Sequence, residues 1–300
     1  MKQRGRGVDK SMTTRRVAQI IPAEHTYEGE GFGVFRPFPQ ARLGLLDPFL
    51  LLDEMEPQDH APSEAVGTPD HPHRGFETVT YMIDGEFEHA DSQGNHGTIR
   101  AGGVQWMTAG AGIVHREQPA ESIKRNGGRT HGFQLWVNLP AADKMIAPSY
   151  QGFEPDDIPT VVSDGVTVRV VAGELAGQRG VAATHSPVVY AHVTIEPGAT
   201  FSADLPADNN VGVYVFAGSG TLGTTEQAVN EREFVIYQRE PGTIDITAKE
   251  RVEALLLAGR PLNEPVARYG PFVMNTRQQL IDAFEDYQSG RMGAIAAART

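Results

Sequence analysis

Two short stretches of the sequence, HPHRGFE beginning at His71 and GIVHRE ending at Glu117, contain three histidines and two glutamates. Successive side chains of a β-strand point to opposite faces, so a residue and the one two places further on share a face. His71 and His73 form one such pair, and His115 and Glu117 form another. Two strands that face each other across a barrel interior would bring these four groups together. The pattern therefore predicts a site for one metal ion.

The sequence around these histidines is typical of short β-strands joined by tight turns. Residues 78–83 (TVTYMI) are rich in β-branched and aromatic side chains and are followed by Asp84-Gly85, a strong hairpin signal. Further strand signals lie at residues 87–89, 98–100, 104–108 and 132–138, between glycine-rich turns. This spacing predicts an all-β sandwich or barrel.

A second all-β unit is predicted in the second half of the chain. Its strand signals lie at residues 160–162, 166–171, 188–195, 211–216, 234–237 and 252–257. Residues 139–158, which contain three prolines, are the best candidate for a linker between the units. Tyr81 begins the sequence YMIDG and Tyr214 begins YVFAG, a short echo that suggests duplication. No histidine follows Tyr214, so only the first unit is predicted to have kept metal ligands.

One helix is predicted near the C-terminus, over residues 276–289. The residues on its apolar face are Leu280, Ile281, Phe284 and Tyr287 or Gln288. Asn275 and Gln278 have the spacing of a capping box, and Gly290 suits the C-terminal cap. The helix is expected to pack on a sheet.

The composition limits the compartment and the partners. The 300 residues carry 26 Lys and Arg against 38 Asp and Glu, a net charge of −12, which argues against direct nucleic-acid binding. There are no cysteines, and therefore no disulfides or thiolate ligands. No apolar run approaches the ~20 residues that span a bilayer, and no stretch near the start resembles a secretory signal. A cytoplasmic protein without membrane contact is predicted, with a small molecule or another protein as partner.

The predicted site suits a divalent transition metal. Imidazole nitrogens together with one carboxylate oxygen are ligands for iron, manganese, cobalt, nickel, copper or zinc. Four protein ligands around an octahedral ion leave two positions open, as catalysis requires. Two unrelated surface pairs would produce the same spacing, but the glutamates in phase and the strand context favour a metal site.

Glu77 and the remaining histidines are interpreted differently. Glu77 stays in phase with the first histidine pair if the strand is unbroken, so it is either a further ligand or a residue that orients a histidine, and the second role is favoured. His89 and His96 lie in a hairpin region and are expected to be solvated or to stabilise turns. His131, beside a predicted strand, is the only other histidine singled out.

Five longer motifs extend over nearly the whole chain after its N-terminal tail. They are LDPFLLLDE (residues 46–54), DHPHRGFETVT (70–80), QWMTAGAGIVH (105–115), LWVNL (135–139) and YGPFVMNT (269–276). In this order they resemble the pirin family, within the cupin superfamily of metal-binding β-barrels. The resemblance implies a bicupin, with two tandem cupin barrels of the jelly-roll type and a C-terminal helix.

The resemblance also implies how the chain is divided. Residues 1–16, rich in Lys, Arg and Gly, are predicted to be a disordered tail. Residues 17–143 would form the N-terminal metal-binding cupin domain, and residues 144–300 a degenerate cupin domain that ends in the helix.

By resemblance, one metal ion, most often iron, is held by His71, His73, His115 and Glu117. The chain departs from the general cupin pattern, because Gly110 stands where proline is usual and Glu117 replaces Glu77 as the acidic ligand. Both departures are shared with pirins.

Two activities of different classes are attached to the family. Some members resemble quercetin 2,3-dioxygenases, in which the flavonol oxygens meet the open metal positions, a carboxylate takes the hydroxyl proton, and dioxygen opens the ring with release of carbon monoxide. The base here would be Glu117 or Glu77. Other members act through protein partners, as transcriptional co-regulators or modulators of metabolic enzymes. The enzymatic function is favoured, because three histidines and one glutamate with open positions suit oxygen chemistry.

Overall fold

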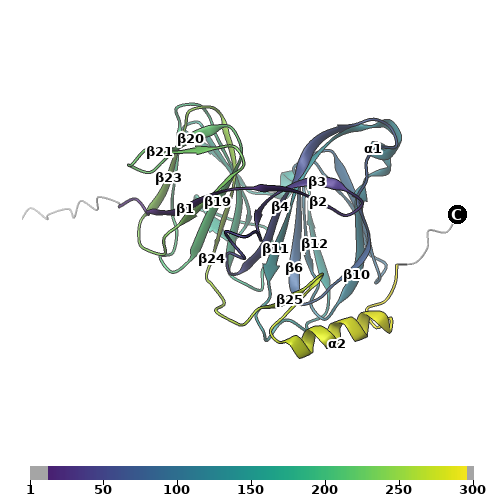
Figure 1. The fold of residues 1–300 in the computed structure, drawn as a ribbon. Helices are drawn as coiled ribbons and strands as arrows, with labels where there is room; N and C mark the ends of the chain where they lie inside the picture. The colour runs from purple at the N-terminus through teal and green to yellow at the C-terminus, as the bar shows by residue number, and fades with distance from the viewer. Residues whose placement is uncertain (1–12, 296–300) are drawn as a thin grey trace, which may run out of the picture.

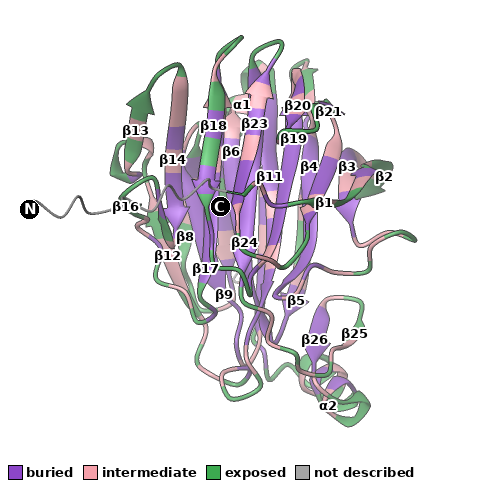
Figure 2. Ribbon diagram, turned by 90° about the vertical axis from the view of Figure 1, so that its left-hand side faces the viewer, coloured by how far each residue is buried: buried purple, intermediate pink, exposed green. Residues whose placement is uncertain are grey.

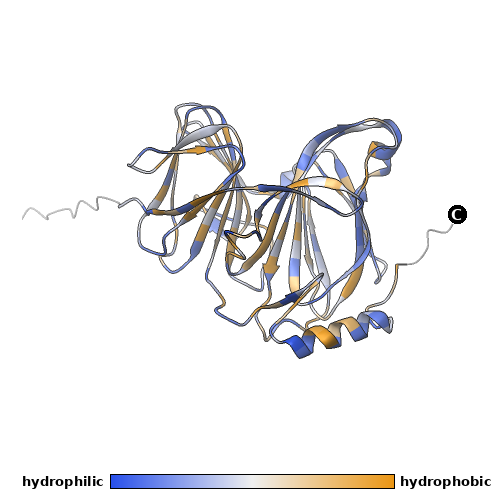
Figure 3. Cartoon of the chain, in the orientation of Figure 1, coloured by the Kyte–Doolittle hydropathy of each residue, from blue (hydrophilic) through white to orange (hydrophobic). Residues whose placement is uncertain are grey.

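The computed structural model describes residues 13–295, which form two β-barrels side by side and a helix packed on the first barrel (Figure 1). The predicted all-β architecture with a C-terminal helix is confirmed. Buried residues run along the central strands, and exposed residues gather at turns and edges (Figure 2). Hydrophobic residues lie along the strands of both barrels and on part of the C-terminal helix (Figure 3). Within residues 13–295, no helix has the length and apolar character needed to cross a membrane.

The first barrel consists of a seven-stranded and a four-stranded antiparallel sheet. The order of the larger sheet is β12 (Ser149–Phe153), β9 (Val104–Thr108), β6 (Phe76–Asp84), β11 (Gly128–Asn138), β4 (Phe49–His60), β3 (Phe32–Phe38) and β2 (Glu24–Glu28). The order of the smaller sheet is β5 (Thr68–His73), β10 (Ile113–Pro119), β7 (Glu86–Asp91) and β8 (His96–Arg100). The short helix α1 (Glu121–Asn126) connects β10 to β11. The predicted linker, residues 139–158, therefore contributes β12 to the first barrel.

The second barrel repeats this construction. The order of its larger sheet is β1 (Val17–Pro22), β22 (Glu233–Tyr237), β19 (Asn210–Ala217), β24 (Val252–Gly259), β17 (Val188–Ile195), β14 (Val166–Ala172) and β13 (Thr160–Ser163). The order of its smaller sheet is β18 (Thr200–Asp204), β23 (Thr243–Ala248), β20 (Ser219–Leu222) and β21 (Gln227–Asn230). The short turn η1 (Pro155–Asp157) precedes β13, and the small hairpin of β15 (Glu174–Leu175) and β16 (Gln178–Arg179) follows β14.

The two barrels match strand for strand, in agreement with the sequence echo. Tyr81 lies on β6 and Tyr214 on β19, and each of these strands is third in the order of its seven-stranded sheet. By the same matching, β18 and β23 correspond to the histidine-bearing strands β5 and β10. In place of histidines, these two strands direct the side chains of Phe201, Ile244 and Ile246 into an apolar core. The interior of the second barrel is therefore filled with hydrocarbon.

The larger sheets of the two barrels pack against each other through a shared apolar core, to which both tyrosines belong. Each tyrosine hydroxyl contacts one member of a His–Glu pair on the other barrel. Tyr81 contacts His192, whose other ring nitrogen lies beside Glu253, and Tyr214 contacts Glu54, whose other carboxylate oxygen lies beside His131. The Tyr81 hydroxyl is 2.8 Å from His192 Nδ1, and the Tyr214 hydroxyl donates to Glu54 Oε2 at 2.6 Å. These two tyrosine hydroxyls are thus paired across the interface.

The start of the chain belongs to the second barrel, contrary to two predictions. β1, predicted within the first domain, pairs with β22. Residues 13–16 belong to the predicted disordered tail, but Arg15 is buried and its Nη2 donates to the carbonyl oxygens of Leu205 and Pro206, at 2.7 and 3.1 Å. Residues 1–12 lie outside the described residues. Local sequence shows strand propensity but not which sheet edge is free, so the partner of β1 could not be predicted.

The end of the chain returns to the first barrel. The hairpin of β25 (Ala267–Tyr269) and β26 (Phe272–Met274) and the helix α2 (Arg277–Gln288) pack beside β5. The Val273 amide donates to the carbonyl oxygen of Arg74, at 3.1 Å, and Arg74 Nη2 donates to Asp286 Oδ2 on α2, at 2.7 Å. Gly75, with φ +88°, permits this contact, because a Cβ at that position would lie 2.0 Å from the Val273 carbonyl oxygen.

Helix α2 forms where the sequence predicts it, with two differences. Its capping box is formed by Thr276 and Gln279, one residue later than the predicted pair, because the Thr276 hydroxyl accepts from the Gln279 amide. Leu280 is buried as predicted, but Ile281 is 42% exposed, since only a narrow stripe of the helix meets the barrel. The helix therefore keeps apolar side chains on its outer surface.

A buried lysine ties the C-terminal segment to the first barrel. Lys144 is 1% exposed, and its ammonium donates to the carbonyl oxygen of Gly75, to Asn138 Oδ1 and to the carbonyl oxygen of Val273, at 2.7, 2.7 and 3.0 Å. Burial lowers the pKa of this lysine to about 8. Three segments distant in sequence are thus held by one cation.

We expect Lys144→Met to lower the free energy of unfolding by about 2–4 kcal/mol, because three buried acceptors lose a charged donor. The lysine pKa is lower in the folded state than in the unfolded chain, so its contribution to stability rises with pH above about 8. Urea unfolding at several pH values should show the gap between wild type and variant widening between pH 8 and pH 10. A gap independent of pH would contradict the assignment, and Lys249→Met, at an exposed lysine, is the control.

Candidate metal centre

The three predicted histidine ligands meet between two paired strands of the smaller sheet. His71 and His73 lie on β5 and His115 lies on β10, where it stands directly opposite His71. One nitrogen from each ring can be chosen so that all three lie within 4.8 Å of one another. The pairing of β5 with β10 is irregular between His115 and Glu117, because Glu117 stands opposite Thr68. Such bulges redirect side chains, and they are common beside functional sites.

Backbone carbonyls determine which nitrogen of two histidines carries the proton. His71 Nδ1 lies 2.7 Å from the carbonyl oxygen of Pro69, and His73 Nδ1 lies 3.2 Å from that of Pro271. Since a carbonyl only accepts hydrogen bonds, both Nδ1 atoms are protonated and both Nε2 atoms carry lone pairs. These two Nε2 atoms are 3.0 Å apart. Two facing lone pairs repel unless a cation lies beside them, as in a metal site.

The third histidine completes the arrangement. Both ring nitrogens of His115 are buried and have no hydrogen-bond partner among residues 13–295. Burial lowers the pKa of His71, His73 and His115, and the mutual repulsion of their charged forms lowers the pKa of the last two further. All three rings therefore stay neutral, which is the state in which histidine binds metals. An unpaired, buried and neutral imidazole among two others fits a metal ligand.

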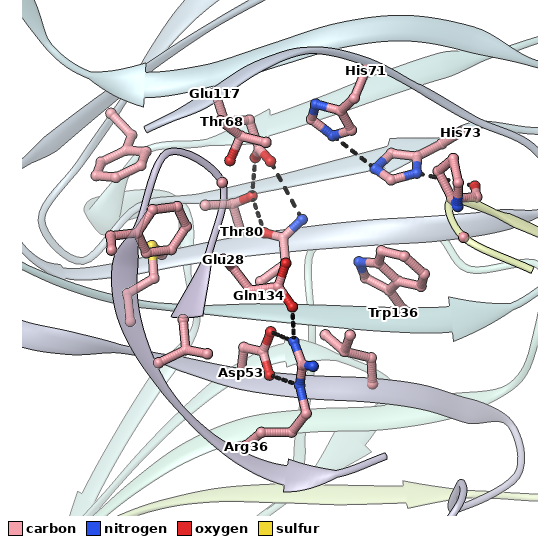
Figure 4. A pocket seen from close by; sticks show the side chains of 18 of the residues that line it. Glu28, Arg36, Asp53, Thr68, His71, His73, Thr80, Glu117, Gln134 and Trp136 are labelled. Atoms are coloured by element: carbon pink, nitrogen blue, oxygen red, sulfur yellow. Dashed lines mark hydrogen bonds and ion pairs between the residues drawn. The ribbon is translucent and has the colours of Figure 1, made fainter. Parts of the chain in front are cut away.

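His71 and His73 also border a cavity of about 490 Å³ inside the first barrel. Figure 4 shows the histidines at one end of the cavity and the Arg36–Asp53 ion pair at the other, with Gln134 and Trp136 between them. The volume lies within the range of small-molecule sites. The histidine cluster thus opens onto a space large enough for a small organic molecule.

Glu117 lines this cavity but does not belong to the group of three histidines. Its Oε1 lies 2.5 Å from Thr80 Oγ1, which also lies 2.7 Å from Gln134 Oε1. Gln134 Nε2 donates to Glu117 Oε2 at 3.4 Å. Burial raises the pKa of Glu117, and the hydrogen bond from Thr80 opposes this effect. The carboxyl group is therefore oriented by two neighbours on the wall of the cavity.

Glu77 lies elsewhere, and the prediction that it stays in phase with the histidines is wrong. The chain turns at Gly75, so Glu77 lies on a new strand, β6, on which Thr80 faces the cavity and Glu77 points to the opposite side. There Thr108 Oγ1 donates to Glu77 Oε1 at 2.8 Å, and burial raises the pKa of the carboxyl group. Glu77 is thus separated from the cavity by its own strand.

The other histidines depart in part from expectation. His96 is exposed as expected, but His89 is buried and stacks on the ring of Tyr150, with centroids 5.2 Å apart. His131 lies at the barrel interface, where its Nε2 is 3.0 Å from Glu54 Oε1. Neither His89 nor His131 belongs to the metal group.

Several residues of the cavity were not predicted from the sequence. The polar ones are Glu28, Arg36, Asp53, Thr68, Thr80, Gln134 and Arg268, and Trp136 is the largest aromatic one. The only local sequence signal for any of these residues was that Gln134 and Trp136 are two places apart on one strand and therefore share a face. Arg268 comes from the distant C-terminal segment, which no local pattern connects to this barrel.

The comparisons with known proteins agree with this fold and site. The family model described as Pirin matches residues 31–137, and that of the pirin C-terminal cupin domain matches residues 190–293. The chain is 42% identical to a pirin-like protein of Solanum lycopersicum over 93% of both chains. It is 36% identical to the pirin of Homo sapiens over 94% of this chain and 95% of that protein.

This chain is also similar to a protein of known crystal structure, a quercetin 2,3-dioxygenase of Acinetobacter baumannii. It superposes with a TM-score of 0.90 at 38% identity, covering 95% of this chain and 100% of that one. The prediction of two tandem cupin barrels is thereby confirmed. From its motifs, its fold and these matches, the chain belongs to the pirin family of the cupin superfamily.

Proposed function

We propose that the protein is a metal-dependent dioxygenase that opens the ring of quercetin or a similar flavonol. The observation that carries this proposal is the convergence of three neutral imidazoles beside a cavity of about 490 Å³. The similarity to a quercetin 2,3-dioxygenase over nearly the whole chain supports the same function. The substrates would be the flavonol and dioxygen.

One divalent metal ion would be held by His71, His73 and His115, with Glu117 as the acidic ligand from the same cavity. The donor set suits Fe(II) best for oxygen chemistry, and Mn, Ni, Co, Cu and Zn accept the same ligands. When bound, the metal supplies Lewis acidity and, in the case of iron, redox chemistry at positions that the protein leaves open. The facing lone pairs of His71 and His73 are the feature that fits such an ion.

The side chains of the cavity would position the flavonol and move one proton. Of the carboxylates that line the cavity, Glu117 lies at the end of the histidines, so it would accept the proton of the flavonol hydroxyl, while Thr80 and Gln134 keep it oriented (Figure 4). Glu77, the other candidate base, is screened by β6. Phe87 and Trp136 supply apolar surface that favours a flat aromatic ring over water.

A non-enzymatic function is favoured by a different observation. Arg74, adjacent to His73, is buried and joined to Asp286 on α2, and the outer surface of α2 exposes Ile281 and Tyr287. A change at the metal site would therefore occur close to the apolar outer surface of α2, which a protein partner could cover. In this alternative the chain is an iron-binding regulator of a transcription factor or a metabolic enzyme.

For the metal site, we expect His73→Ala and His115→Ala each to weaken metal affinity by at least about 100-fold, because a direct ligand is lost. The measurement is a competition titration with a chelator, after elemental analysis has established one metal per chain in the wild type. His96→Ala, at an exposed histidine of the same barrel, should bind like the wild type. Tight binding of one metal by His73→Ala would remove this histidine from the site.

For the activity, the protein stripped of metal and reloaded with Fe(II) should consume quercetin and oxygen and release carbon monoxide. We expect Glu117→Gln to lower kcat by about 10²–10⁴-fold, as for the loss of a general base. Glu77→Gln is the matched control and should retain activity, because that carboxyl group faces away from the cavity. Metal content is measured for each variant, so that a lost ligand is separated from a lost base.

The same assay separates the two proposed functions. Absence of turnover with Fe, Mn, Ni, Co, Cu and Zn, together with a partner recovered specifically by the wild type and lost with Ile281→Ser, would overturn the dioxygenase proposal in favour of the regulator.

A further inference from the structure

Four polar side chains form a row across the floor of the cavity, on four neighbouring strands. Thr80 on β6 pairs with Gln134 on β11, which pairs with Asp53 on β4. Asp53 binds Arg36 on β3 through both of its oxygens, at 2.7 and 2.5 Å. Neighbouring strands are about 4.8 Å apart, so the row spans roughly 14 Å. Its first end contacts Glu117 near the histidines, and its other end lies away from them (Figure 4).

The far end of this row carries the Arg36 guanidinium and the carboxylates of Asp53 and Glu28, and the charge of Arg268 acts on all three. Arg36 Nη2 also donates to Glu28 Oε1, at 2.5 Å. Arg268 lies over the Trp136 ring, with Cζ 4.7 Å from the ring centroid, and within residues 13–295 its one hydrogen bond goes to a backbone carbonyl, at 3.2 Å. The formal charges of Glu28, Asp53, Arg36 and Arg268 cancel. Arg268 nevertheless keeps N–H groups free to bind a ligand.

Apolar side chains line the cavity beside this polar row. Phe32 and Val34 on β3, Leu51 on β4 and Trp136 on β11 supply this surface. The cavity therefore combines a polar row with apolar walls, and it has the histidines at one end and the Arg36–Asp53 pair at the other (Figure 4). A flat aromatic molecule with oxygen substituents at both ends fits this lining.

We propose that the far end of the cavity recognises hydroxyl groups on the part of the substrate remote from its metal-binding oxygens, and that Arg268 sets this preference. The inference rests on the proposed function, because that function places the chelating oxygens of a flavonol at the histidines. A hydroxyl group can accept a hydrogen bond from Arg268 and donate one to Glu28 or Asp53. Arg268 is thus a specificity-determining residue supplied by the C-terminal segment.

The charge balance favours a neutral hydroxyl over a carboxylate at this end. A carboxylate near Arg268 would also face Glu28 and Asp53, which lie in the same cluster. Because the four protein charges already cancel, an added negative charge would have no net attraction. A hydroxyl uses both the donors and the acceptors of the cluster.

The test compares two flavonols in wild-type protein and in Arg268→Leu. Quercetin carries hydroxyl groups on its remote ring, whereas 3-hydroxyflavone keeps the chelating oxygens and lacks the others. The protein is loaded with Zn(II), which has no redox chemistry, and binding is followed without oxygen by the fluorescence of Trp136. The second tryptophan, Trp106, is fully buried in the interface core, so quenching reports the cavity.

We expect the wild type to bind quercetin about tenfold more tightly than 3-hydroxyflavone, and Arg268→Leu to lose about tenfold for quercetin but less than about twofold for 3-hydroxyflavone. Arg268→Lys should recover part of the loss, and Arg260→Gln, at an arginine outside the cavity, should match the wild type. Equal losses for both ligands, no preference in the wild type, or no binding of either would overturn the inference.

The outcome of this binding test can be distinguished from the outcome of the turnover test of the proposed function. Turnover of quercetin by the Fe(II) protein, with equal losses for both ligands in Arg268→Leu, would leave the dioxygenase standing and remove the role of Arg268. Selective loss of quercetin binding without turnover by the Fe(II) protein would support the role of Arg268 and count against the dioxygenase. Tighter binding of a flavonol carrying a carboxylate on the remote ring would also overturn the proposal.

Discussion

Nε2 of His71 and Nε2 of His73 lie 3.0 Å apart and both carry lone pairs, a contact that is unfavourable without a cation, and several distant parts of the chain hold the two rings in place. The carbonyls of Pro69 and Pro271 fix both rings in the same tautomer. Pro69 lies on β5 itself, two residues before His71, but Pro271 is 198 residues away from His73. The metal chemistry of the first barrel therefore depends on a segment that follows the second barrel, and on Gly75, Arg74 and Lys144, which hold that segment in place.

The exchange of chain ends makes the two barrels interdependent. The first strand completes a sheet of the second barrel, and the last hairpin lines the cavity of the first, with α2 packed beside that hairpin. The shared apolar core between the large sheets adds to this coupling, because separating the barrels would expose it to water. One consequence is that the cavity, although it lies inside the first barrel, takes its far-end guanidinium from the last part of the chain.

The sequence was informative where the determinants are local. Strand periodicity placed His71, His73 and His115 together, and the tyrosine echo anticipated the matching of β6 with β19. The prediction that Glu77 shares a face with His71 and His73 failed at Gly75. The positive φ of this glycine turns the chain, and strand periodicity does not continue through such a turn. The sheet of β1, the packing of α2 beside the histidines and the arrival of Arg268 depend on contacts between residues far apart in sequence. Asp53 and Arg36 could not be assigned to the cavity for another reason. A charged pair on the floor of a barrel has the same sequence pattern as a charged pair on a surface.

The reciprocal tyrosine contacts at the interface bear on the evolutionary origin of the two barrels. Tyr81 reaches a His–Glu pair of the second barrel, and Tyr214 reaches a His–Glu pair of the first, so the two barrels are related like the subunits of an isologous dimer. Such an interface is what a single-barrel ancestor pairing with itself would leave after gene fusion. Once the partners were joined, selection on one copy could act on its docking face alone. The apolar filling of the second barrel is the expected fate of a subunit retained for support, while its twin kept the metal.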